Sequence, residues 1–157
     1  MELSELDYLI LAMASQDVVS GYAMKKVMEG MRGGRWSADS GSVYRVIRRH
    51  VDRGLLREKG KNGSPNRERT EYEVTEEGDR LVLDWLRRPP GRDELGYQVE
   101  ALRTRAYFLG RLKPEERVET VRRWMKEAKA YRTEVGTFIA SVSTPSSLLG
   151  VAMSNLG

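Results

Sequence analysis

Apolar residues recur at spacings of three and four in the first part of the chain, as they do on the buried face of a helix. The pattern predicts three helices, over residues 4–15, from Ser20 to the pair Gly33-Gly34, and from Ser40 to Gly54. Ser4, Ser20 and Ser40 can each act as an N-cap, and Asp7 stands in the capping-box position of the first helix. Gly54 can adopt the left-handed conformation that ends many helices, so the third helix is expected to stop there.

After Gly54 the pattern changes to that of a β-hairpin followed by another helix. Residues 55–59 and 69–74 predict two strands, and the Gly, Asn and Pro of residues 60–65 predict a loop between them. Thr75 is a suitable N-cap for a fourth helix. The apolar positions of that helix are Leu81, Val82, Trp85 and Leu86. The predicted order of three helices, a hairpin and a helix is that of a winged helix-turn-helix.

A second helical part follows Pro89-Pro90-Gly91, which we interpret as a linker. Residues 96–112 predict a helix. One face of it carries Val99, Leu102, Ala106 and Leu109. Residues 115–142 predict a long helix that ends before Thr144-Pro145, and the last dozen residues predict a short terminal helix.

The long helix carries a seam of apolar residues. Its members are Val118, Val121, Met125, Ala128, Val135, Ile139 and Val142. Such a seam, sustained over about three or four heptads, is typical of helices that pack lengthwise on one another. We therefore expect a mainly α protein, with a winged helix-turn-helix in residues 1–88 and a helical dimerisation domain in residues 92–157.

The composition excludes several kinds of chemistry. The chain has 157 residues, of which 39% are hydrophobic and 32% charged, with one histidine and no cysteine. Disulfides, zinc fingers and thiol catalysis are therefore excluded, and nearly all carboxylates stand near Arg or Lys, which gives no support to an acid/base dyad. No secretory signal and no apolar run near the ~18 residues of a membrane span is present. We expect a cytoplasmic protein that is not an enzyme and has no cofactor, metal or membrane partner.

The net charge of +4 is concentrated in one segment. Residues 45–69 contain nine basic and three acidic residues, a net of +6, so the rest of the chain carries −2. A basic stripe on a slightly acidic protein indicates a surface for a polyanion such as double-stranded DNA. The alternative is an ordinary solvated surface, since Arg and Lys are common on exposed helices.

The third predicted helix separates apolar from basic residues. At about 100° per residue, its inner side consists of Val43, Val46, Ile47 and His50. Its outer side carries Arg45, Arg48, Arg49 and Asp52. Guanidinium groups near the start of a helix can bind guanine or phosphate in the major groove, and the hydroxyls of Ser40 and Ser42 are suited to phosphate. We therefore predict DNA contacts from the outer side, and for His50 burial with one hydrogen bond rather than a pH switch.

The predicted hairpin offers a second basic element. Its tip, residues 60–67, is polar and suited to lie along a phosphate backbone or in the minor groove. The candidate contact residues there are Lys61, Asn66, Arg67 and Arg69.

An ordered set of short motifs resembles the PadR family of bacterial transcriptional regulators. The motifs are Ser20-Gly21-Tyr22, Trp36, Ser40-Gly41-Ser42-Val43-Tyr44, Arg48-Arg49, Gly54-Leu55, Tyr72-Glu73-Val74-Thr75 and Gly78. The resemblance covers residues 4–88, and the segment from Glu94 onward is more loosely similar to the dimerisation domain of the family. Four positions depart from the family pattern. They are Ser20 in place of His, Arg45 in place of Pro, His50 in place of Leu, and residues 66–71 in place of an Arg-Pro-Arg-rich run.

The resemblance implies a homodimer that binds a pseudo-palindromic operator, usually as a repressor of a neighbouring gene. It places DNA contacts on Tyr22, Ser42, Tyr44, the outer arginines and the wing. It also implies a small aromatic effector bound between the DNA-binding and dimerisation helices. Trp124 stands beside the seam rather than in it, so we expect its ring at an open rim where an effector or a dimer mate can stack.

A function of another class remains open at this point. The chain can instead be a winged-helix module that pairs with other proteins and has no DNA specificity. In that case the outer arginines are dispensable, and the affinity for duplex DNA does not depend on its sequence.

Overall fold

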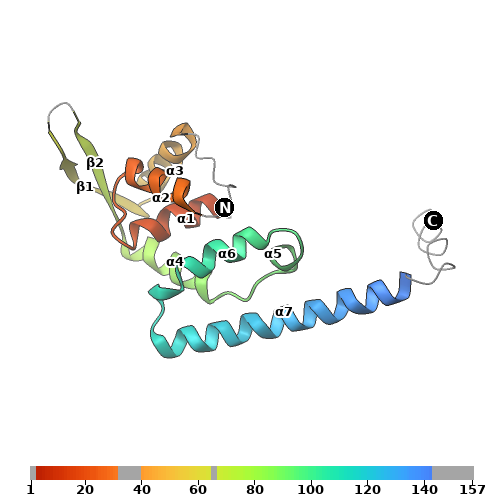
Figure 1. The fold of residues 1–157 in the computed structure, drawn as a ribbon. Helices are drawn as coiled ribbons and strands as arrows, with labels where there is room; N and C mark the ends of the chain where they lie inside the picture. Colours follow the sequence, from red (N-terminus) through yellow and green to blue (C-terminus); the bar gives the residue numbers. More distant parts are fainter. Residues whose placement is uncertain (1–2, 32–39, 65–66, 143–157) are drawn as a thin grey trace.

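The computed structural model describes residues 3–31, 40–64 and 67–142. Its elements are α1 (Glu5–Ala14), α2 (Gly21–Gly30), α3 (Ser40–Asp52), β1 (Leu56–Asn62), β2 (Arg69–Val74), α4 (Glu76–Arg87), α5 (Arg92–Gly96), α6 (Val99–Tyr107), the 3-10 helix η1 (Leu109–Arg111) and α7 (Pro114–Val142). Figure 1 shows the hairpin projecting from one end of the molecule, and α4–α6 lying between α1–α3 and the long α7. A winged helix followed by further helices confirms the predicted fold class.

Short-range hydrogen bonds explain where several helices begin and end. The side-chain oxygens of Ser4, Ser20 and Thr75 each accept from the backbone N–H three residues later, as the sequence predicted for N-caps. Asp7 completes the capping box of α1 by accepting from the N–H of Ser4 (2.9 Å). Gly54, with φ of 69°, follows α3 in the left-handed conformation. These local bonds are what allowed the boundaries to be predicted.

Helix α2 ends earlier than expected. The apolar pattern extends it to Gly33-Gly34, but the helix stops at Gly30, and Met31 has an extended backbone as its C-cap. Glycine is a poor helix former, and it weakens the last turn at this point.

The core of the first four helices is centred on α1. Residues 9–13 of this helix are fully buried, because α3, α4 and β2 pack around it. A helix that is apolar on all sides belongs at the centre of a domain. The core includes the inner side of α3 and one side of α4 through Val43, Val46, Ile47, Val82, Trp85 and Leu86. This packing fixes α3 and leaves its opposite side to solvent.

The hairpin is longer than its sequence predicted. Strand β1 continues to Asn62, which pairs with Arg69, and a bulge between Glu58 and Gly60 interrupts the antiparallel register. The segment before α2 also pairs with β2, since the N–H of Tyr72 donates to the carbonyl oxygen of Val19 (2.7 Å). The wing is therefore attached to the start of α2 as well as to α3.

The helix predicted over residues 96–112 is broken, and the apolar face named for it is only partly buried. Residues 99–111 form α6 and η1, while α5 ends at Gly96, and Val99 is half exposed (47%). The buried residues are instead Ala101, Thr104, Arg105, Phe108 and Leu112. The break follows Gly96, where the Tyr131 hydroxyl of α7 comes so close that a Cβ would lie 2.6 Å from it.

Helix α7 agrees with the predicted long helix, and begins at Pro114, where a missing N–H has no cost. Its expected end at Thr144-Pro145, the short terminal helix after it and Trp36 lie outside the described residues. None of the helices in the described ranges combines the length and the apolar character that a membrane crossing requires.

Candidate nucleic-acid interface

The outer side of α3 is open to solvent and carries Tyr44, Arg45 and Arg48. All three side chains are exposed, Tyr44 to 50%. Arg45 lies along the first turn of its own helix, where its Nε donates to the carbonyl oxygen of Gly41 (3.2 Å) and its Nη2 to the Ser42 hydroxyl (3.0 Å). A guanidinium and a hydroxyl thus meet at the N-terminal end of α3, the end by which recognition helices contact base edges.

Arg49, predicted beside Arg45 and Arg48, has a partly exposed side chain (41%) that also reaches back to α1. Its guanidinium donates to the carboxylate of Asp7 on α1, a side chain with only 5% exposure. Burial raises the pKa of Asp7, but hydrogen bonds from Ser4 and Arg49 outweigh this effect and hold the pKa below its usual value. The Asp7 carboxylate is therefore ionised, and it ties α3 to α1 through Arg49.

His50 contacts the same aspartate from the inner side of α3, buried as predicted. Its Nε2 lies 3.2 Å from the carbonyl oxygen of Asp7 and 3.3 Å from Asp7 Oδ1. Burial lowers the pKa of His50, and the attraction of Asp7 offsets only part of that effect. A neutral ring that donates from Nε2 to the carbonyl oxygen fits this geometry. Through Arg49 and His50 together, Asp7 fixes the rotation of α3 about its axis.

Two tyrosines join α2, α3 and the wing into one surface. The ring of Tyr44 lies directly over Gly21, where a Cβ would come within 2.5 Å of it. The Arg69 guanidinium stacks on the ring of Tyr22, with Cζ 3.7 Å from the ring centroid. The close approach explains why glycine is required in the Ser20-Gly21-Tyr22 motif. The Tyr22–Arg69 stack was not predicted, because nothing in either local sequence indicates it.

Two of the five cationic side chains of the wing are paired with carboxylates on the wing itself. Lys61 forms an ion pair with Glu68 (3.0 Å) and Arg57 forms one with Glu73 (2.5 Å). The hydrogen bond to Glu68 raises the pKa of Lys61 above its usual value. The wing therefore presents less unpaired positive charge than its count of basic residues suggests.

The remaining predicted contact residues are placed unevenly. Arg67 is exposed at the end of the hairpin. Ser40 is the first residue of α3, but its side chain and the whole of Asn66 lie outside what the structure describes.

Comparison with known proteins identifies the fold and a family that part of the chain resembles. Residues 10–83 match the sequence model of the Transcriptional regulator PadR-like family. Through these residues, just under half of the chain, the protein is similar to the PadR-like family. No curated protein gives a significant match.

Solved structures of Bacillus subtilis PadR are similar to the chain. The PadR structure in complex with operator DNA has a TM-score of 0.52 and 21% identity, over 92% of this chain and 80% of that chain. The structure in complex with p-coumaric acid has a TM-score of 0.48 and 21% identity, over 97% of this chain and 88% of that chain. The first of these likenesses shows a shared fold.

Beyond the PadR-like residues, the predicted seam of α7 is largely open in the single chain. Val118, Met125 and Ile139 are about half exposed, Ala128 is exposed, and the partly buried members are Val121, Val135 and Val142. Phe138, which the sequence analysis did not include, is 60% exposed beside Ile139.

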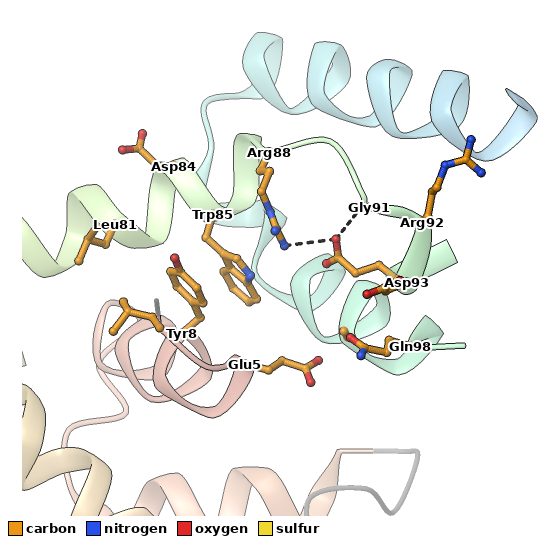
Figure 2. A pocket seen from close by; sticks show the side chains of 13 residues that line it. Glu5, Tyr8, Leu81, Asp84, Trp85, Arg88, Gly91, Arg92, Asp93 and Gln98 are labelled. Atoms are coloured by element: carbon orange, nitrogen blue, oxygen red, sulfur yellow. Dashed lines mark hydrogen bonds and ion pairs between the residues drawn. The ribbon is translucent and has the colours of Figure 1, made fainter. Parts of the chain in front are cut away.

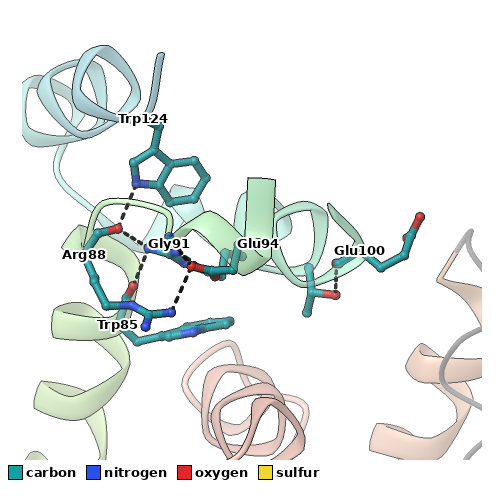
Figure 3. Close-up of polar contacts among 8 residues, drawn as sticks. Trp85, Arg88, Gly91, Glu94, Glu100 and Trp124 are labelled. Atoms are coloured by element: carbon teal, nitrogen blue, oxygen red, sulfur yellow. Dashed lines mark hydrogen bonds and ion pairs between the residues drawn. The ribbon is translucent and has the colours of Figure 1, made fainter. Parts of the chain in front are cut away.

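Trp124 does not lie at an open rim, and this part of its prediction is wrong. The ring is 8% exposed, and its Nε1 donates to the carbonyl oxygen of Arg88 (3.1 Å; Figure 3). The guanidinium of Arg105 covers it, with Cζ 4.5 Å from the ring centroid. The guanidinium of Arg105 therefore covers the ring face on which we expected an effector or a dimer mate to stack.

A cavity of about 750 Å³ lies between α1, α4 and α5, at the edge of the PadR-like residues (Figure 2). Tyr8 and Trp85 form one wall, with parallel rings whose centroids are 5.2 Å apart. Arg88 and Glu94 border the cavity and form an ion pair (3.2 Å), while the Arg92 side chain points away from it. The cavity was not predictable from the sequence, because its lining comes from three separate segments. Among the described residues, no group of three or more His, Cys, Asp or Glu side chains is arranged to hold a metal ion.

Proposed function

We propose that the protein is a homodimeric, sequence-specific DNA-binding regulator that represses transcription from a pseudo-palindromic operator. The observation that carries the proposal is the outer side of α3, where Arg45 and Arg48 are exposed while the inner side is fixed in the core. The PadR-like match supports it. So does the shared fold with Bacillus subtilis PadR, which was solved in complex with operator DNA.

Arg45 and Arg48 are the base-reading residues of this proposal. A bidentate pair between a guanidinium and guanine discriminates against other bases by about 1–3 kcal/mol. Arg49 has another role, because its ion pair with buried Asp7 fixes α3 on α1. Arg45→Ala or Arg48→Ala should therefore relax sequence preference at one position, whereas Arg49→Ala should weaken binding without changing the preferred base.

The other contact residues position the protein on the sugar–phosphate backbone, which carries no direct sequence information. They are Tyr22, Ser40, Ser42, Tyr44, Lys61, Asn66, Arg67 and Arg69. The packing of Tyr44 on Gly21 and of Arg69 on Tyr22 supports this assignment, since it keeps α2, α3 and β2 on one continuous surface.

Dimerisation through α7 supplies the second half of the interface. The exposed seam offers apolar surface, whose burial stabilises a complex by about 25 cal/mol per Å². One recognition helix contacts only a few base pairs, so two copies about 34 Å apart, one helical turn of DNA, are needed for useful specificity.

A small aromatic effector is proposed to bind beside Tyr8 and Trp85 and to release the protein from DNA. The cavity volume of about 750 Å³ lies within the usual range for small-molecule sites, about 300–1,000 Å³, and its stacked rings offer an aromatic face. Trp124 contributes indirectly, through Arg105. Titration with planar aromatic acids, amines and neutral compounds should give saturable tryptophan quenching that Trp124→Phe retains and Trp85→Phe loses. Quenching that does not saturate with any compound would exclude the effector site.

A gel-shift titration on the DNA that flanks the gene of this protein tests the DNA-binding proposal. We expect a shift that a shuffled duplex of the same length competes for poorly, and that weakens as salt rises because phosphate contacts release counterions. Arg45→Ala/Arg48→Ala should bind both duplexes alike. Equal binding of the wild type to both duplexes would refute sequence-specific regulation through this site.

The paired charges favour a second candidate function, a winged-helix module that binds another protein. Arg49 is engaged by Asp7, and Lys61 by Glu68, so part of the basic stripe is neutralised within the chain. This candidate predicts that the same gel shift shows no sequence dependence and that Arg45 and Arg48 are dispensable.

A further inference from the structure

A fully buried arginine connects the helices between the winged helix and α7. Arg105, on α6, has no exposed surface. Its guanidinium donates to the Glu94 carboxylate (2.9 Å), to the carbonyl oxygen of Trp85 (2.8 Å) and to the carbonyl oxygen of Arg88. Trp85 and Arg88 lie at the C-terminal end of α4, where a helix leaves its own carbonyl groups unpaired. Arg105 therefore ties α6 to both α4 and α5.

Two indole rings lie over the same guanidinium. Arg105 Cζ is 4.5 Å from the ring centroid of Trp124 on α7 and 5.9 Å from that of Trp85. Figure 3 shows the indole of Trp124 reaching toward Arg88, whose carbonyl oxygen it shares with Arg105. We call Arg105, Trp85, Arg88, Trp124 and Glu94 together the Arg105 cluster. Four helices, α4 to α7, meet in it.

The direction of α7 depends on this cluster more than on any extended apolar contact. Within the described part of α7, the buried residues are Thr120 and Trp124. Arg117 donates to the carbonyl oxygens of Leu109 and Leu112 (both 3.2 Å), which fixes the first turns of the helix. Beyond the cluster, the Tyr131 hydroxyl contacts Gly96 of α5, and ion pairs at the surface, which contribute little, join α7 to α4 and α5.

We propose that Arg105 is a positioning residue that sets the direction of α7 relative to α3, and thereby the separation of the two recognition helices in the dimer. The inference rests on the proposed function, because it requires two copies joined through α7. Residues 124–142 span about 27 Å, so a tilt of about 10° at Trp124 moves the far end by about 5 Å. This displacement exceeds the rise of one base pair, about 3.4 Å. A dimer that lacks the Arg105 cluster loses its preference for one half-site spacing.

Distance measurements between spin labels test this inference without knowledge of the operator. The chain contains no cysteine, so Asp52→Cys, at the exposed end of α3, provides one label in each subunit. Pulsed electron–electron double resonance then reports the separation of the recognition helices in the dimer. Arg105→Lys keeps the charge but removes the planar guanidinium. The matched control is Arg103→Lys, an exposed position on the same helix that pairs with Glu100 (2.8 Å).

A second variant, Trp124→Phe, removes the indole hydrogen bond to Arg88 and keeps Arg105 in place, so it provides the test if Arg105→Lys does not fold. We expect one narrow distance distribution in the wild type and in Arg103→Lys. The cluster variants should broaden or shift it by about 5 Å, with unchanged circular dichroism and dimer mass. Unchanged narrow distributions in the cluster variants overturn the role of Arg105 and leave the proposed function standing. A wild type without dipolar coupling is not a dimer, and that result overturns the proposed dimer itself.

Discussion

Replacing His50 by Leu is expected to remove the acid sensitivity of folding that begins below about pH 6.5. His50 is the single histidine of the chain and is fully buried. Burial lowers its pKa from the usual 6.5, against a partial opposing effect of Asp7. The unfolded chain then binds the proton more readily than the folded protein does. The stability that neutral His50 supplies is therefore fully present above the unfolded pKa and is lost as the pH falls toward the folded pKa.

The size of the effect follows from one proton and one hydrogen bond. A single group changes the free energy of unfolding by at most about 1.4 kcal/mol per pH unit. Near pH 8 the substitution removes the bond from Nε2 to the Asp7 carbonyl oxygen (3.2 Å), at a cost of about 0.5–1.5 kcal/mol. It also removes the buried Nδ1, which has no hydrogen-bond partner among the described residues. His50→Leu should thus be close to the wild type near pH 8 and more stable than it in weak acid.

Urea unfolding measures the difference in stability between the wild type and His50→Leu. It is followed by tryptophan fluorescence at steps between about pH 5 and pH 8. The wild type should lose stability relative to His50→Leu once the pH falls below about 6.5. Asp7 does not interfere, because hydrogen bonds keep its pKa below the usual value of 3.8 despite its burial. Parallel stability curves for the two proteins across this range would refute the reasoning.

Three further substitutions test other parts of the structure. Asp7→Asn keeps the side-chain shape but removes the charge that pairs with Arg49, and should lower the free energy of unfolding by about 1–2 kcal/mol in urea; no change would mean that Arg49 does not fix α3. Glu68→Gln frees Lys61 from its ion pair (3.0 Å), so the slope of log K against log salt for a random duplex should steepen by about 0.9, and an unaltered slope would place Lys61 away from DNA. Val135→Asp puts a charge in the seam of α7, and should halve the mass in analytical ultracentrifugation; an unchanged mass would exclude the seam as the dimer interface.

Much of the fold was predictable because its signals are local. The caps at Ser4, Ser20 and Thr75 act through amides three residues away, and Gly54 acts through its own backbone. The separation of α3 into an apolar and a basic side is likewise a property of thirteen consecutive residues. Such features are contained in a short window of sequence.

The errors arise where a remote side chain decides the outcome. The ion pair of Arg49 with a buried carboxylate was not predicted, because Asp7 lies on another helix. Trp124 is covered because Arg105 inserts between it and Trp85. The cavity beside Trp85 is likewise a product of tertiary packing, since its walls come from three segments. Periodicity and residue type cannot identify such partners, because neither contains the distance between two helices.

The central claim is that Arg48, with Arg45, reads bases in two half-sites at a fixed separation. Selection of binding sites from a random duplex pool, with the wild type and with Arg48→Ala, tests it most directly. We expect the wild type to enrich a pseudo-palindrome with a guanine in each half-site, and Arg48→Ala to keep the half-site spacing while losing the preference at one base pair in each half. The same base preference in both proteins, or no enrichment by the wild type, would contradict the claim.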